Sequence, residues 1–207
     1  MIEQIKPMDI EKRSFEIITQ LLGDRKLNPE NESVIKRVIH TSADFDYADN
    51  LVFSDHAVSL GIQALKSGCD IVTDTQMAKA GINKTILAKL GGQVHCFMSD
   101  PNVAAEAKQR GITRAIVSME RSAKLDKPCS FAIGNAPTAL ICLHELIRSG
   151  KLTPALVIGV PVGFVNVVES KELILTDSIP HIVARGRKGG SNVAAAICNA
   201  LLYQITR

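Results

Sequence analysis

After residue 50 the chain alternates between short apolar runs and segments long enough to form a helix. The runs lie at residues 51–53, 70–73, 94–97, 115–118, 130–133, 156–160 and 181–184. The segments between them are expected to be helices at 55–67, 75–90, 101–110, 136–149, 167–177 and 190–205. Strands that alternate with helices form a mainly parallel sheet covered on both faces. The pattern therefore predicts a doubly wound α/β fold.

Two further helices are expected ahead of the first strand. The first is expected at residues 7–22, carries an apolar stripe and ends at Gly23; the second is expected at residues 29–41 and has its own apolar face. The stripe consists of Ile10, Ile17, Ile18 and Leu21, and the second face of Val34, Ile35, Val38 and Ile39. No repeat or Gly/Pro-rich linker divides the chain, so we expect residues 1–207 to form one domain.

The runs at 115–118 and 130–133 depart from the alternation. The charged connector at 120–128 is short for a helical crossover between parallel strands. The sequence predicts a protruding loop or an arm at this point.

Composition excludes several classes of protein. The net charge of +3 is too small to indicate nucleic-acid binding. No run approaches the ~18 apolar residues of a membrane span, and residues 1–9 lack the apolar region of a signal peptide. The five cysteines form no Cys-x-x-Cys pair, so we expect reduced, mostly buried thiols. The chain is expected to be soluble and cytoplasmic, with no membrane or nucleic-acid partner.

The chemistry of an open parallel sheet is expected beyond the carboxyl ends of its strands. Five loops follow those ends, at 74–77, 99–102, 134–138, 159–164 and 185–192. Three of them carry glycines, which permit sharp turns and a close approach of the backbone to a ligand. The helices that follow direct free N–H groups into the same crevice, which suits anions. Asp74 opens the first loop.

The turn at 185–191 has the strongest signal for anion binding. It joins Arg185, Arg187 and Lys188 to three glycines just before an expected helix. The turn matches neither the Gly-x-Gly-x-x-Gly pattern nor the phosphate-binding loop of nucleoside triphosphatases, so no nucleotide is indicated. A solvated turn whose glycines only close the bend remains the alternative.

Three polar residues on the leading helices are further candidates for a site. Arg37 and His40 lie about 60° apart on a helical wheel, opposite the apolar face. A nearby guanidinium disfavours the protonated imidazole, which suits a proton-transfer group. The alternative is a solvated polar face. Ser14 lies within the apolar stripe, where its hydroxyl needs a partner: most often the carbonyl four residues back, at Ile10, and less often a ligand.

No spacing in the sequence specifies a metal centre or a nucleophilic triad. We therefore expect no cofactor and no metal.

Five phrases of the sequence, taken in order, resemble those of the precorrin-8X and cobalt-precorrin-8 methylmutases. They are Arg13-Ser-Phe-Glu-Ile-Ile, Arg37-Val-Ile-His, Gly134-Asn-Ala-Pro-Thr-Ala-Leu, Pro161-Val-Gly-Phe-Val with Glu169-Ser-Lys, and Gly186-Arg-Lys-Gly-Gly-Ser. The similarity extends over essentially the whole chain. It implies a flavodoxin-like, three-layer fold and a homodimer with active sites near the subunit interface.

The resemblance also implies an activity, that of an isomerase (an intramolecular transferase) of cobalamin biosynthesis. Such an enzyme moves a methyl group from C11 to C12 of an anionic corrinoid precursor, precorrin-8X or cobalt-precorrin-8. The product is hydrogenobyrinate or cobyrinate. By motif, His40 matches the family's catalytic histidine, Ser14 and Arg37 match substrate contacts, and Arg114 matches a further arginine near the macrocycle. The sheet-end loops add Asp74, Arg185 and Lys188 as expected substrate contacts.

Two other functions stay open from the sequence. One is an oxidoreductase of flavodoxin-like or Rossmann-like fold, which the missing nucleotide pattern disfavours. The other is a non-catalytic tetrapyrrole carrier, against which the match around His40 is the main argument.

Overall fold

The computed structural model describes residues 4–206. Residues 1–3 of the segment expected to lack a signal peptide's apolar region lie outside the described residues. A six-stranded sheet in the order β1-β6-β5-β4-β2-β3 forms the centre. The strands are β1 (Leu51–Phe53), β2 (Asp70–Thr73), β3 (Val94–His95), β4 (Cys129–Ile133), β5 (Leu156–Gly159) and β6 (His181–Ala184). Only β1 pairs antiparallel, at the edge beside β6.

The five parallel strands confirm the flavodoxin-like prediction. Counted in chain order from β2, they stand in the spatial order second, first, third, fourth, fifth, which is the flavodoxin arrangement. Every residue of β2, β4, β5 and β6 is buried, as expected of strands covered on both faces.

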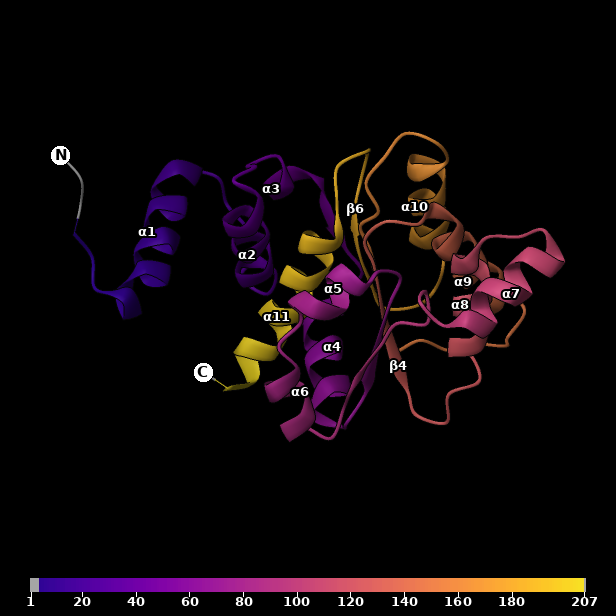
Figure 1. The fold of residues 1–207 in the computed structure, drawn as a ribbon. Helices are drawn as coiled ribbons and strands as arrows, with labels where there is room; N and C mark the ends of the chain where they lie inside the picture. Colours follow the sequence, from indigo (N-terminus) through magenta and orange to yellow (C-terminus); the bar gives the residue numbers. More distant parts are fainter. Residues whose placement is uncertain (1–3, 207) are drawn as a thin grey trace.

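Helices cover both faces of the sheet (Figure 1). One face carries α4 (Ala57–Lys66), α5 (Gln76–Gly81), α6 (Lys84–Lys89) and α11 (Ser191–Thr206); the other carries α7 (Pro101–Arg110), α8 (Arg114–Ser122), α9 (Pro137–Arg148) and α10 (Val167–Leu175). Each face has its own apolar core, built mainly from Ile, Leu, Val and Ala. No described helix is long and apolar enough to cross a bilayer.

The leading helices form an additional layer outside α11. The helix α2 (Glu32–Ser42) packs on α11 through the predicted apolar face, which is buried throughout. The short elements η1 (Pro7–Asp9) and α3 (Tyr47–Asn50) flank this region. The helix α1 (Ile10–Leu22) leans on α2 and reaches out from the body of the molecule (Figure 1). Its predicted stripe is largely exposed: Leu21 is 66% and Ile10 52% exposed, and Ile18 alone is buried.

The prediction of a strand at residues 115–118 is wrong, because this run lies in α8. Thr113 caps the helix by accepting the N–H of Ile116, and the buried residues Ala115, Met119 and Ser122 recur at helical spacing. A short apolar run is compatible with a strand or a helix, and here the Thr113 cap favours the helix. The helix occupies the start of the expected arm, so only a short loop at 123–128 connects to β4.

A second departure concerns the single helix predicted at 75–90. It is divided into α5 and α6 because the Asn83 side chain caps a new helix by accepting the N–H of Ile86.

The free thiols agree with the sequence. All five cysteines are unpaired, and all but Cys96 are buried. Burial raises the pKa of the Cys129, Cys142 and Cys198 thiols to about 12, so they stay protonated at neutral pH.

Asp74 joins the two strands at which the sheet changes winding direction. From β2 the chain proceeds to β3 on one side, and from β4 it proceeds to β5 on the other. The Asp74 carboxylate accepts the N–H groups of Gly134 (2.8 Å), Asn135 (2.8 Å) and Ala136 (2.6 Å) at the start of α9. Burial raises the pKa of Asp74, and these hydrogen bonds oppose that rise. The helix α9 therefore has a built-in anion at its N-terminus.

We predict that Asp74→Ala lowers the free energy of unfolding by about 3 kcal/mol, because it leaves three buried or half-buried N–H groups without an acceptor. Denaturant unfolding followed by circular dichroism measures the change. The matched control is Asp126→Ala, at an exposed loop position, which should shift stability by no more than about 0.5 kcal/mol. Equal effects of the two substitutions would contradict the role assigned to Asp74.

Candidate active site

The five loops at the carboxyl edge of the sheet contact one another directly. Thr75 and Ser191 share a hydroxyl–hydroxyl bond of 2.8 Å, and the Gln76 amide donates to Ser99 at 3.2 Å. The N–H of Gly190 donates to the carbonyl of Val160 at 2.9 Å. With Asp74 bound to the 134–136 backbone, all five loops form one connected rim.

Glycine is required where this rim is tightest. A Cβ on Gly189 would lie 2.1 Å from the Val160 carbonyl oxygen, and one on Gly134 would lie 2.7 Å from the Cα of Ser191. The glycines of the 185–191 turn therefore do more than close a bend, because they allow it to pack against the ends of β4 and β5.

The cations of this turn differ in their surroundings. Lys188 donates to Asp44 at 2.7 Å and to Asp46 at 2.6 Å, and these hydrogen bonds raise the pKa of its ammonium. Arg185 lies 3.4 Å from the Glu172 carboxylate, with both side chains about half exposed. The turn is thus tied to the loop after α2 through Lys188.

Arg187 has no such carboxylate among the described residues. It donates to the Phe164 carbonyl at 2.7 Å, and its guanidinium lies 5.6 Å from the centre of the Phe164 ring. Phe164 itself is 81% exposed. Exposed apolar side chains continue along the same edge, at Val162, Val165 and Met77.

His40 lies on α2, exposed, with its ring stacked on Phe15 of α1. The two ring centres are 5.4 Å apart and the planes differ by 11°. Arg37, one helical turn earlier, places its guanidinium 4.8 Å from the Phe15 ring and 5.0 Å from the Tyr203 ring. It also donates to Glu11 at 2.9 Å.

The solvated-face alternative therefore fails for Arg37, whose side chain is only 12% exposed. His40, in contrast, is exposed, as a solvated face would require. The aromatic contact of both residues with Phe15 gives the imidazole a fixed partner on α1.

Two hollows meet at His40. The first, of 260 Å³, is lined by Arg37, His40, Thr41, Gly81, Asn192, Ala195, Ala196, Asn199 and Tyr203. The second, of 320 Å³, is lined by Ser14, Ile17, Ile18, Leu21, Ile39, His40, Ala43 and Phe45. Asn192 directly follows the 185–191 turn, so the first hollow leads from His40 toward the rim.

Ser14 has the local partner that the sequence favoured. Its hydroxyl donates to the Ile10 carbonyl at 2.9 Å, and the residue lines the second hollow beside His40. The oxygen of this hydroxyl can still accept a hydrogen bond.

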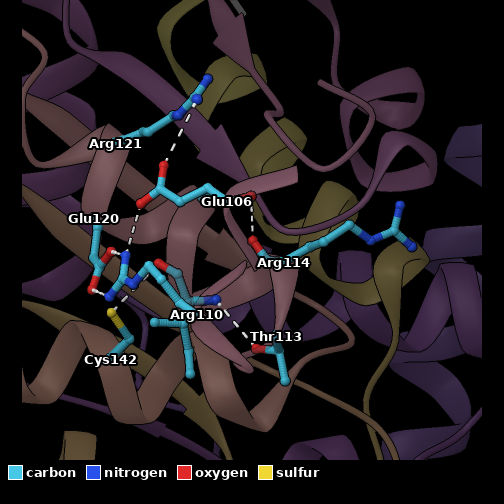
Figure 2. Close-up of polar contacts among 9 residues, drawn as sticks. Glu106, Arg110, Thr113, Arg114, Glu120, Arg121 and Cys142 are labelled. Atoms are coloured by element: carbon cyan, nitrogen blue, oxygen red, sulfur yellow. Dashed lines mark hydrogen bonds and ion pairs between the residues drawn. The ribbon is translucent and has the colours of Figure 1, made fainter. Parts of the chain in front are cut away.

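Arg114 lines neither of the two hollows at His40. Figure 1 places α8, which Arg114 begins, on the opposite side of the sheet from α2. Figure 2 shows Arg110 between Glu106 and Glu120, with Arg121 beyond Glu106, while the Arg114 side chain points away from that cluster. Among the described residues Arg114 has only a long bond, 3.3 Å, to the Met98 carbonyl, so its charge is not balanced by a carboxylate.

The structure therefore brings together His40, Arg37 and Ser14, and separately joins Asp74, Arg185 and Lys188 in the rim. Within one chain, Arg114 lines neither hollow at His40, but it donates to the Met98 carbonyl, next to Ser99 of the rim. Sequence reasoning missed Phe15, Tyr203 and Lys171. Phe15 and Lys171 lie within two of the sequence phrases that carry the family resemblance. Tyr203 has no such signal, because its contact depends on the packing of α11 on α2.

Clusters of metal-binding side chains are absent from the described part of the chain. No group of three or more His, Cys, Asp or Glu side chains there could hold an ion.

Comparisons with known proteins identify the family. A family model described as precorrin-8X methylmutase matches residues 9–204. The chain is 47% identical to the cobalt-precorrin-8 methylmutase of Salmonella typhimurium, over 97% of this chain and 96% of that protein. It is 45% identical to the enzyme of the same name from Priestia megaterium, over 95% and 88%. The crystal structure of precorrin-8x methyl mutase from Thermus thermophilus, 37% identical, superposes with a TM-score of 0.87 over 96% of this chain and 98% of that one. The chain belongs to the precorrin-8X methylmutase family, the isomerases that move a methyl group in cobalamin biosynthesis.

Proposed function

We propose that this chain moves a methyl group from C11 to C12 of its corrin precursor, with His40 as the proton donor or acceptor. The observation that carries the proposal is the position of His40, which is stacked on Phe15 where two hollows meet. One of these hollows leads to the cationic rim. A single exposed imidazole held at such a junction is suited to exchange a proton with a bound macrocycle.

The chemistry demands little more than placement and one proton. The bond from the methyl carbon to C11 breaks and the bond to C12 forms within one molecule, as in a 1,5-sigmatropic shift. No external methyl donor, oxidant or reductant enters. Binding holds the conjugated ring in the productive geometry, and proton transfer at His40 stabilises the reactive tautomer.

The surroundings fit an anionic, partly apolar substrate. The acetate and propionate groups of the precursor need counter-charges, and Arg37, Arg185 and Arg187 border the hollows or the rim. The exposed apolar side chains Phe164 and Val165 offer contact to the flat ring. Asp74, by contrast, acts on the substrate only through the loops it holds, since both carboxylate oxygens already bind backbone N–H groups.

The active enzyme is, in this proposal, a homodimer. One chain places α2, which carries His40, and α8, which Arg114 begins, on opposite faces of its sheet, so the proposal assigns the Arg114 beside each macrocycle to the partner. The projecting helix α1 and the short helix η1 before it supply a surface for the partner, since Met8 of η1 is 84% exposed, and Leu21 and Ile10 of α1 are 66% and 52% exposed. Exposed apolar groups of this size on neighbouring turns of the chain are typical of protein interfaces. One domain over residues 1–207 and a cytoplasmic location belong to the same proposal.

We further propose that the natural substrate is cobalt-precorrin-8, with cobyrinate as the product. The two curated relatives above, at 45% and 47% identity, both carry the cobalt-precorrin-8 name. We predict a kcat/KM at least about tenfold higher for cobalt-precorrin-8 than for metal-free precorrin-8X, measured spectrophotometrically with each substrate alone. A preference for the metal-free substrate would contradict this choice.

His40→Ala should lower kcat by at least about 100-fold, because general acid–base catalysis typically contributes that much or more. Conversion is followed by the change in the absorption spectrum of the corrinoid, with no cofactor added. His56→Ala is the matched control, since His56 is also exposed but lies in another part of the chain, and it should keep the parental rate.

A parental rate for His40→Ala would remove the proton-transfer role. Product binding without turnover by the unaltered protein would favour the carrier, and dependence on added flavin or nicotinamide would favour the oxidoreductase.

Mixed dimers test the shared site. In a heterodimer of one His40→Ala chain and one Arg114→Ala chain, one site carries both substitutions and the other carries neither. We predict about half of the parental activity for purified heterodimers, whereas each homodimeric variant is strongly impaired. Heterodimers as inactive as the two homodimeric variants would show that His40 and Arg114 act within one chain.

A further inference from the structure

Lys171 is a charged residue in an unusual place. It lies in α10, and its side chain is fully buried. It is the only buried lysine or arginine of residues 4–206. Burying an ammonium group costs several kcal/mol before compensation, and a methionine would fill similar space without that cost. The lysine must therefore contribute something that an apolar side chain cannot.

That contribution is a pair of hydrogen bonds to the 185–191 turn. The Lys171 ammonium donates to the carbonyl oxygen of Gly186 at 2.7 Å and to that of Lys188 at 2.9 Å. These two carbonyls flank Arg187. The turn is thus held from inside the fold by α10, while Gly190 and Gly163 hold it to the end of β5 and the loop that follows.

The direction of these carbonyls sets the direction of two N–H groups. In a planar trans peptide the C=O and the N–H point in opposite directions. With the carbonyls of Gly186 and Lys188 turned inward toward Lys171, the N–H groups of Arg187 and Gly189 point outward. Neither N–H has an acceptor among residues 4–206. Arg187 is exposed and Gly189 is half-buried, so a ligand can reach both groups.

We propose that Lys171 is a positioning residue: it shapes the 185–191 turn so that the outward N–H groups of Arg187 and Gly189 bind a carboxylate of the corrin precursor. Two outward amides, separated by one residue and lying beside a guanidinium, can bind one carboxylate between them. This inference rests on the proposed function, because it assigns part of the same substrate to the rim. Lys171 itself does not touch the substrate. Burial lowers its pKa to about 8, so the ammonium prevails at neutral pH and can bind both carbonyls.

The test is Lys171→Met, which keeps the apolar stem and removes the donor. We expect KM to rise by about tenfold or more with kcat within about twofold, since only binding of a remote carboxylate is impaired. The matched control is Lys127→Met. Lys127 also donates to a main-chain carbonyl, Gly91, at 2.7 Å, but at the opposite edge of the sheet, so this variant should keep the parental KM.

A second measurement needs no variant. In ¹H–¹⁵N NMR spectra of the unaltered protein, cobyrinate at saturating concentration should shift the amide signals of Arg187 and Gly189, and leave that of Gly91 in place. A folded Lys171→Met protein with unchanged KM would overturn the proposal. So would amide signals of Arg187 and Gly189 that stay in place.

These outcomes separate the two proposals. Failure of the unaltered protein to convert substrate would remove the proposed function, and this inference with it. An active parental enzyme together with an unaffected Lys171→Met removes the role of Lys171 alone.

Discussion

The Asp74 carboxylate holds together the place where the sheet changes winding direction. A parallel sheet that winds both ways leaves a crevice there, and the free N–H groups of the following helix would draw an anion into it. In this chain the anion is built in, since Asp74 satisfies the backbone from Gly134 to Ala136. Substrate anions must therefore be bound elsewhere on the rim. The 185–191 turn, packed against the ends of β4 and β5, is a cationic element at that edge.

The catalytic group that we propose lies outside the sheet, on a layer of helices added to the flavodoxin-like core. The helix α2 carries His40 and Arg37, α11 supports them through Tyr203, and α1 covers them with Phe15. This layer depends on α1, most of whose apolar stripe finds no cover within its own chain. Assembly and the environment of His40 are thus coupled in the proposed dimer, because the helix that stacks on the imidazole also presents the surface for a partner.

Much of this fold follows from the sequence, because central parallel strands are continuous apolar runs and helices separate them. The prediction of a strand at 115–118 is wrong because three apolar residues do not determine a period, and the Thr113 cap starts a helix there. The site was harder to predict. The wheel placed Arg37 on a solvated face, whereas Phe15 and Tyr203, from helices distant in sequence, bury its guanidinium. Lys171 gave no signal of burial, because a lysine in an amphipathic segment is normally exposed. The family resemblance selected His40, which periodicity alone would have left as a surface residue.

A crystal structure of the protein with cobyrinate bound tests the proposed role of His40 most directly. We expect an imidazole nitrogen of His40 within hydrogen-bond reach, about 2.6–3.2 Å, of ring C or of one ordered water bound to it. We also expect Arg114 of the partner subunit beside the same macrocycle. A corrin whose ring C lies away from His40 of both subunits would contradict the proposed proton transfer.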